Sequence, residues 1–191
     1  SCASRGLGDV YHRQGTNPAY LAGRENELDM AETTFQALRL QIPVQSIIYT
    51  GLRGVGKTVL LNQMEELAKK ESIECRHIEV ENRNDFISQI ITCCQVFLRS
   101  ISTGERMKQT ISKAVDALKS LAVSFSPESS TFSLSMQEQE LYKTTNLTQS
   151  LTDVFISVGE AARDANKPIC FFIDEMQYMK GNELSSLIAA L

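Results

Sequence analysis

Residues 51–58 read Gly51-Leu52-Arg53-Gly54-Val55-Gly56-Lys57-Thr58, and this stretch decides the expected fold. It matches G-x-x-x-x-G-K-T, the pattern of a phosphate-binding P-loop. Glycine reaches backbone conformations closed to other residues, so successive N–H groups can face one anion, and a following helix adds the positive end of its dipole. Lys57 would bring a point charge to the β- and γ-phosphates, and Thr58 a hydroxyl to Mg²⁺. The alternative is a glycine-rich turn with an incidental lysine.

The flanks of the loop favour the phosphate-binding interpretation. Residues 46–50, Ser-Ile-Ile-Tyr-Thr, are uncharged and mostly β-branched or aromatic, which predicts a strand buried on both faces. Downstream, apolar residues recur at helical spacing. They are Leu60, Leu61, Met64, Leu67 and Ala68. Strand, glycine loop and helix form the setting in which this motif binds phosphate.

A second chemical feature lies far along the chain, where the apolar run Ile169–Ile173 leads into Asp174 and Glu175. A parallel strand beside the P-loop strand would bring both carboxylates to the carboxyl edge of the sheet, where ligands bind. Asp174 could then hold Mg²⁺ opposite Thr58, and Glu175 could orient and deprotonate an attacking water. The alternative is a strand that ends in two solvated acids.

Three further polar residues leave two interpretations open. Gln177 and Asn182 follow the acidic pair closely, and each could touch a phosphate or its water, or line or cap a helix. Arg53 could contact phosphate from a neighbouring subunit or face solvent.

The chain has 191 residues and a net charge of -4, and its composition is typical of a soluble globular protein. The acidic balance argues against a dedicated DNA-binding surface in this segment. No apolar run is long enough to span a membrane, and no signal peptide is visible. Five scattered cysteines indicate reduced thiols in the cytoplasm; buried core thiols are favoured over a metal site. The first residue is Ser1 rather than Met, so we expect a processed form or a fragment.

The remaining pattern predicts alternating strands and helices. Residues 1–18 lack periodicity and are expected to form an N-terminal arm. We expect helices over about 25–40, after Asp85, after Gly104, from Asn146 and from about 182, strands over 73–80 and 169–173, and a hairpin over 123–136. This order indicates an α/β fold with three layers and a mainly parallel sheet.

The order of motifs resembles a known superfamily. Gly23-Arg24-Glu25-x-Glu27-Leu28, then Gly51–Thr58, then Ile169–Glu175 are similar to motifs of the AAA+ and STAND ATPases, most of all to prokaryotic ATP-binding proteins grouped with origin-recognition-type ATPases. The resemblance covers residues 19–191, which we expect to form one P-loop ATPase domain. The long stretch between Lys57 and Asp174 departs from the family, so we expect a helical and β-hairpin insertion over about 100–145.

The resemblance implies a nucleotide site and its ligands. In this family the Gly-Arg-Glu box lies beside adenine and ribose; the alternative for Arg24 and Glu25 is a helix N-terminus with surface charges. The implied nucleotide-binding residues are Leu21, Ala22, Gly23, Arg24, Gly51, Leu52, Arg53, Gly54, Val55, Gly56, Lys57, Thr58 and Val59. Catalysis falls to Glu175 and Lys57, and the Mg²⁺ ligands are Thr58 and Asp174. Such domains continue into a sensor strand, an arginine finger and a helical lid, so this chain is expected to be an incomplete domain.

The leading hypothesis is Mg²⁺-dependent binding and hydrolysis of ATP. The second is a nucleotide switch that turns over slowly or not at all and regulates a partner or an attached DNA-binding region. A DNA-loading or replication-initiation factor is a third hypothesis, suggested by family analogy alone. Adenine is favoured because no Asn-Lys-x-Asp stretch, which would read guanine, is present. Self-association is expected for the full-length protein.

Overall fold

The computed structural model describes residues 23–52, 54–81, 86–101, 107–125 and 146–191. The described helices and strands are, in chain order, α1 (Glu25–Arg39), α2 (Lys57–Lys70), β1 (Glu74–Glu79), α3 (Phe86–Ile101), α4 (Lys108–Phe125), α6 (Leu147–Asp164), β2 (Ile169–Asp174), η3 (Met176–Tyr178) and α7 (Gly181–Ala190). The predicted helices and the strands over 73–80 and 169–173 are confirmed within these residues.

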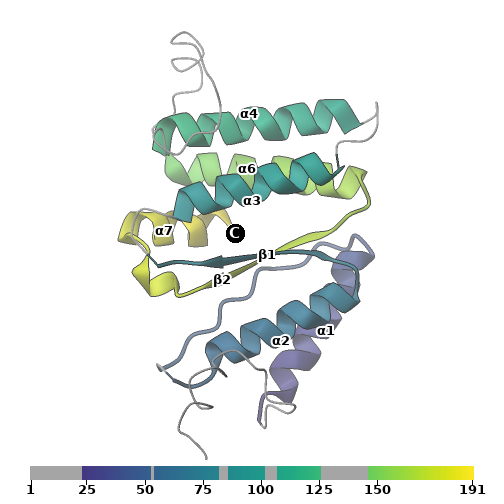
Figure 1. Ribbon diagram of the computed structural model, residues 1–191, viewed down its shortest axis with the longest axis vertical. Coiled ribbons are helices and arrows are strands. Elements are labelled where there is room, and N and C mark those ends of the chain that lie inside the picture. Colours follow the sequence, from purple (N-terminus) through teal and green to yellow (C-terminus); the bar gives the residue numbers. More distant parts are fainter. Residues whose placement is uncertain (1–22, 53, 82–85, 102–106, 126–145) are drawn as a thin grey trace, which may run out of the picture.

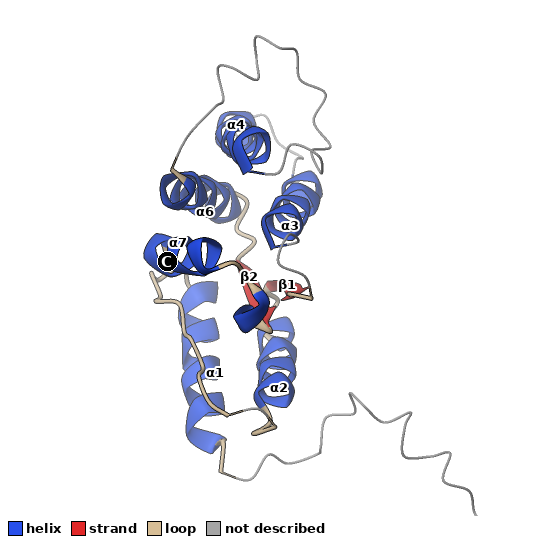
Figure 2. Cartoon of the chain, turned by 90° about the vertical axis from the view of Figure 1, so that its left-hand side faces the viewer, coloured by secondary structure: helices blue, strands red, loops and turns tan. Residues whose placement is uncertain are grey.

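The described elements lie in layers around a parallel pair of strands (Figures 1 and 2). Helices α1 and α2 cover one face of the β1–β2 pair, and α3, α6 and α7 cover the other. Helix α4 lies outside α3 and α6 and contacts both. The parallel arrangement requires a long crossover, which α3, α4 and α6 provide.

Alternation along β2 sends neighbouring side chains into two different cores. Phe172 packs with Phe35 of α1, their ring centroids 6.2 Å apart. Phe171 faces the other way and packs with Phe155 of α6, with centroids 6.4 Å apart. The same period of two places Asp174 on the face of Phe172, which is the face covered by α1 and α2. A strand buried on both faces explains why Ile169–Ile173 carries no charge.

Three helices end in the same local geometry without a glycine. Gln41, Ser72 and Asn166 have φ values of 59°, 60° and 52° and directly follow the C-caps of α1, α2 and α6. At each of these helix ends two backbone hydrogen bonds close the last turn. At α2, the Ser72 N–H donates to the Lys69 carbonyl and the Ile73 N–H to the Ala68 carbonyl. This is the Schellman arrangement, in which glycine is the usual residue. Each of these residues therefore carries a backbone strain that glycine would relieve.

The strand predicted over residues 46–50 is wrong in this structure. The segment is extended but pairs with neither β1 nor β2, and the described sheet contains only those two strands. Ile47 and Ile48 are 40% and 46% exposed instead of buried. Strand formation requires a neighbour that accepts and donates main-chain hydrogen bonds. The described residues supply no such neighbour at this position.

The hairpin predicted over 123–136 is wrong at its start, because residues 123–125 form the last turn of α4. Ala114, Leu118 and Leu121 continue one apolar helical face into this turn, and helical packing overrides the local alternation. The rest of that hairpin, the N-terminal arm and Asp85 lie outside the described residues. The boundaries of the predicted insertion remain a prediction.

A polar cluster between α2 and β1 ties these two elements together. Glu65 Oε2 accepts a hydrogen bond from His77 Nδ1 at 2.9 Å, and Glu65 Oε1 contacts Lys69 Nζ at 2.8 Å. Burial alone would raise the pKa of the Glu65 carboxyl above its ordinary value of 4.5. The hydrogen bonds from Lys69 and His77 outweigh burial, and the pKa is lowered.

We predict that this cluster contributes to acid lability. A lowered pKa in the folded state gives stability that is present above pH 4.5 and is lost as the pH falls through the folded value. Glu65→Gln should reduce the free energy of unfolding at pH 7 and flatten its decline between pH 5 and pH 3, measured by urea titration. Glu32→Gln, at an exposed site on α1 outside the cluster, is the control and should keep the wild-type slope. Equal slopes for wild type and Glu65→Gln would contradict the assignment.

Candidate functional site

The glycine loop bends as its sequence predicts. Gly54 and Gly56 have φ values of 82° and 84°, in the left-handed region that favours glycine. Gly56 is also the N-cap of α2, so this helix begins directly at the loop. Lys57 folds back over the loop, and its Nζ donates to the carbonyl oxygens of Gly51 and Leu52 at 3.0 and 2.8 Å. The lysine charge therefore lies over the loop at the N-terminus of α2. An anion bound there would be stabilised by this charge and by the positive end of the helix dipole.

Arg24 joins the Gly-Arg-Glu box to this loop. Its guanidinium donates to Glu27 Oε1 at 2.7 Å and, through its other terminal nitrogen, to the Val55 carbonyl oxygen at 3.2 Å. Arg24 occupies the N-cap position of α1 without a side-chain capping hydrogen bond, and it follows Gly23, which has a φ of 79°. The planar guanidinium of Arg24 thereby holds the start of α1 and the glycine loop together, although they are far apart in the sequence.

The Arg24 contact also fixes the direction of an amide in the loop. In a trans peptide the C=O and the next N–H point in opposite directions. The Val55 carbonyl points to Arg24, so the Gly56 N–H points away from it.

The hydrogen bond from Arg24 also lowers the pKa of Glu27, which keeps this carboxylate charged beside the guanidinium.

The acidic pair forms a tight turn at the end of β2. The Glu175 N–H donates to Asp174 Oδ1 at 2.8 Å. Glu175 itself has φ 59° and ψ 32°, an unusual conformation for a residue with a side chain. Its Oε2 accepts a hydrogen bond from Gln177 Nε2. The hydrogen bond from Gln177 thus orients the Glu175 carboxylate.

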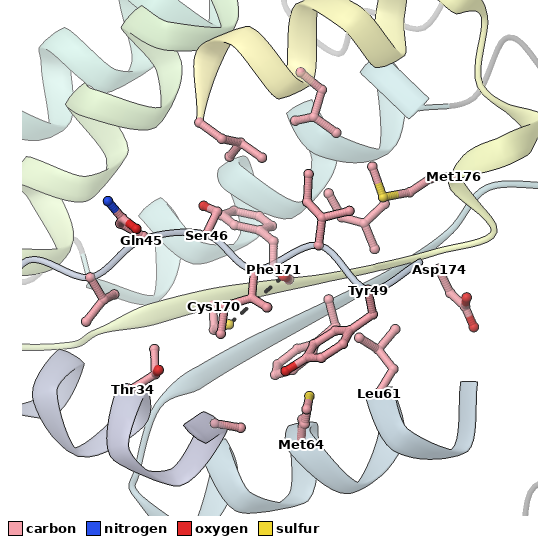
Figure 3. Close-up of a pocket in the computed structure, with 18 of the residues that line it drawn as sticks. Thr34, Gln45, Ser46, Tyr49, Leu61, Met64, Cys170, Phe171, Asp174 and Met176 are labelled. Atoms are coloured by element: carbon pink, nitrogen blue, oxygen red, sulfur yellow. Dashed lines mark hydrogen bonds between the residues drawn. The ribbon is translucent and has the colours of Figure 1, made fainter. Parts of the chain in front are cut away.

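A cavity of about 530 Å³ lies beside the acidic pair, and Asp174 is labelled in its lining in Figure 3. It runs between residues 44–49 and β2, and Lys57, Asp174 and Glu175 are among the residues that line it. The rest of its lining is mostly apolar. Thr58 is exposed in the first turn of α2, outside this lining. Lys57 and both carboxylates therefore line the same cavity.

Other predicted residues have different positions. Leu21, Ala22 and Arg53 lie outside the described residues. Gly51, Leu52, Gly54 and Val55 are exposed, and Gly56, Lys57 and Val59 are half-buried. Asn182 lies in the first turn of α7 and is absent from the cavity lining, whereas Gln177 lies in it. Glu25 accepts the Gly23 N–H at 3.3 Å, so it stabilises the start of α1.

Sequence reasoning missed two residues. Glu27 was quoted in the motif but given no role, and it forms an ion pair with Arg24. Its position three residues after Arg24 at the start of a predicted helix could have indicated this pair. Tyr49 lines the cavity, and its buried hydroxyl has no hydrogen-bond partner within the described part of the chain. Burial, followed by the charge of Glu27, raises the pKa of Tyr49, which keeps the phenol protonated. No local pattern marks such a tyrosine, because only the fold decides what surrounds it.

Four of the five cysteines lie in the described ranges. Cys94 is buried, Cys75, Cys93 and Cys170 are half-buried, and all four are free. Burial raises the pKa of Cys75 to about 11 and that of Cys94 and Cys170 to about 12, so these thiols stay protonated and unreactive. No group of three or more His, Cys, Asp or Glu residues could bind a metal among the residues described. None of the described helices has the length and apolar character needed to cross a membrane.

Comparison with known proteins agrees with these motifs. The family model described as "AAA ATPase domain" matches residues 20–191. No curated protein and no solved structure matches the chain. The matched range contains the Gly-Arg-Glu box, the glycine loop and the acidic pair at the end of β2. With a P-loop α/β fold and the sequence signature of a nucleotide-hydrolysing domain over nearly its whole length, the chain belongs to the AAA ATPase domain family.

Proposed function

We propose that this domain binds ATP with Mg²⁺ and hydrolyses the β–γ phosphoanhydride bond, with Lys57 and Glu175 as its catalytic residues. The supporting observation is the shared cavity, which is lined by Lys57 of the glycine loop and by Asp174 and Glu175 from a distant part of the chain. A basic anion site opposite an acidic pair is the arrangement that phosphoryl transfer to water requires.

Each residue has a role that follows from its chemistry. The loop amides and the Lys57 ammonium would hold the β- and γ-phosphates and stabilise negative charge that develops in the transition state. To do so, Lys57 exchanges its two loop carbonyl partners for phosphate oxygens. Glu175 would accept a proton from the attacking water, and Gln177 keeps that carboxylate oriented. The box residues Gly23 and Arg24 would lie on the adenine side.

The residues also suit Mg²⁺. Thr58 offers a hydroxyl and Asp174 a carboxylate, and Mg²⁺ is held in proteins by few carboxylates together with phosphates and water. Asp174 Oδ1 is occupied by the Glu175 amide, while Oδ2 has no hydrogen bond from any other described residue. When bound, Mg²⁺ would neutralise charge on the β- and γ-phosphate oxygens.

A slowly hydrolysing nucleotide switch is the second candidate. Residues 46–50, which lead into the glycine loop, are not held by strand pairing to any described element. A glycine loop whose preceding segment lacks strand pairing can still bind phosphate, but it positions a transition state poorly. Catalysis is far more sensitive than binding to small errors in geometry. Tight retention of ADP or ATP with undetectable steady-state turnover would favour the switch, and robust multiple turnover would exclude it.

The first prediction for the proposed function separates ATP binding from hydrolysis. Lys57→Ala should weaken ATP binding by more than about tenfold, since a hydrogen bond to a charged group contributes roughly 1.5–3 kcal/mol. Glu175→Gln should keep ATP affinity and stop turnover. Calorimetry measures the first effect and phosphate release the second. Lys70→Ala, at the exposed far end of α2, is the control and should behave as wild type. Equal ATP affinity for wild type and Lys57→Ala would refute the assignment.

The second prediction concerns Arg24 as a positioning residue for the loop. Arg24→Ala should speed hydrogen exchange of the loop amides in nucleotide-free protein and weaken ATP binding by about tenfold, because a bond to the Val55 carbonyl and an ion pair are lost together. Arg24→Lys should restore little, since one ammonium does not reproduce the fork. Arg39→Ala, which breaks an exposed ion pair to Glu71 at the other end of α1, is the control. Unchanged exchange in Arg24→Ala would count against this role.

The third prediction uses backbone strain. Glu175→Gly and Ser72→Gly should each raise the free energy of unfolding by about 1 kcal/mol, because glycine adopts a positive φ without steric cost. Their effects on turnover should differ: Ser72→Gly keeps it, whereas Glu175→Gly abolishes it. Thermal melts and phosphate release measure the two quantities. If Ser72→Gly raises the free energy of unfolding and Glu175→Gly does not, the backbone at Glu175 carries no strain that glycine relieves.

A further inference from the structure

Tyr49 carries a buried polar group that the proposed mechanism does not use. Its ring packs against the core cluster that contains Ala31, Phe35 and Met64, and it is labelled in the cavity lining in Figure 3. Its hydroxyl is buried and has no hydrogen-bond partner among the described residues. A buried hydroxyl without a partner destabilises a protein and is rare in folded chains. This orphan group therefore indicates that the hydroxyl has a partner in another state of the site.

The fold places one charged acceptor on the same side of α1, the carboxylate of Glu27. Glu27 lies one helical turn before Ala31, so both residues share the face of α1 that packs toward Tyr49. The charge of Glu27 acts on Tyr49, because it adds to the effect of burial in raising the pKa of the phenol. Glu27 Oε1 accepts from Arg24 at 2.7 Å, whereas no other described residue donates to Oε2. Since a carboxylate accepts several hydrogen bonds, Oε2 can take the phenol O–H while Oε1 keeps Arg24.

The short path from Tyr49 to the glycine loop couples its hydroxyl to phosphate binding, and this step rests on the proposed function. In the structure, Lys57 Nζ holds the Gly51 carbonyl at 3.0 Å. Lys57 would release this carbonyl when it turns to the phosphates, and Gly51 is two residues from Tyr49. Residues 46–50 pair with no described strand, so their main chain can move with the loop.

We propose that Tyr49 is a positioning residue whose hydroxyl donates to Glu27 Oε2 when ATP is bound. This bond completes a chain of contacts from Tyr49 through Glu27 and Arg24 to the Val55 carbonyl. The glycine loop is then tied to α1 at two points, at Val55 within the loop and at Tyr49 just before it. Because the hydroxyl gains its partner only in this state, the new hydrogen bond adds to the affinity for ATP.

A purely structural role for the Tyr49 hydroxyl predicts different effects of its removal. A hydroxyl that already had a partner would lower the stability of the protein when phenylalanine replaced the tyrosine, with or without ATP. A hydroxyl that gains its partner only with ATP costs stability until ATP binds. Its removal should therefore leave the nucleotide-free protein at least as stable and should weaken ATP binding.

Tyr49→Phe tests the proposal through two measurements on the same chain. The melting temperature without nucleotide should stay equal or rise by up to about 4 °C, because a buried group without a partner is removed. The dissociation constant for ATP with Mg²⁺, measured by calorimetry, should rise by about tenfold, because a hydrogen bond to a charged group is lost. Tyr178→Phe, at a 45% exposed tyrosine outside the cavity lining, is the control and should change neither quantity.

A double-mutant cycle tests Glu27 as the acceptor. Tyr49→Phe should weaken ATP binding by about tenfold in the wild-type background and by less than about twofold in a Glu27→Ala background, because the acceptor is then absent. Equal effects in the two backgrounds would overturn the proposed bond between Tyr49 and Glu27.

The same measurements separate failure of this role from failure of the proposed function. If wild type binds ATP and Tyr49→Phe binds it with an affinity within about twofold, the role of Tyr49 is overturned and the proposed function stands. A lower melting temperature for Tyr49→Phe without nucleotide also overturns the role, because the hydroxyl would then have a partner before ATP binds. If wild type itself binds no ATP, the proposed function is refuted and the role of Tyr49 is refuted with it.

Discussion

The parallel hydrogen bonds between β1 and β2 are the constraint on which the described structure depends. Their register pairs Glu79 with Asp174, so both strands end at the same edge of the sheet. Because side chains alternate along β2, one core forms beneath Phe172 and another above Phe171. This sandwich fixes where Asp174 emerges and on which face it lies. The two carboxylates therefore owe their position to a ladder whose last pair includes Asp174.

Local conformation at the site follows two different physical solutions. In the glycine loop, Gly54 and Gly56 adopt positive φ values at little steric cost, and amides become available to an anion. At the acidic pair, Glu175 adopts a similar φ with a full side chain. A strained residue of this kind persists only where the surroundings hold it, here through the Asp174 oxygen and Gln177. Stability and function are expected to oppose one another at Glu175 and to be independent at Ser72.

Much of the candidate site was predictable from short-range pattern. The glycine spacing, Lys57 and the apolar run into Asp174 each carry a stereochemical requirement that is local in sequence. The roles of Arg24 and Gln177 were less predictable. The place of Arg24 beside adenine stays a prediction, whereas the contacts of the Arg24 guanidinium with Glu27 and the Val55 carbonyl were not predicted. Gln177 was left between two interpretations, and its contact with Glu175 depends on the turn that Glu175 makes. Such partnerships arise from long-range geometry and leave no periodic trace.

The sequence alone determined the order of helices and strands, the position of the glycine loop and the apolar character of residues 46–50, because those properties depend on neighbours within a few positions. Only the tertiary structure decided whether residues 46–50 become a strand, because a ladder requires a second chain segment at hydrogen-bonding distance. It also decided that α4 extends through residues 123–125, where packing on α6 outweighs a locally alternating pattern. Side-chain character is encoded residue by residue, whereas main-chain pairing is a property of two segments at once.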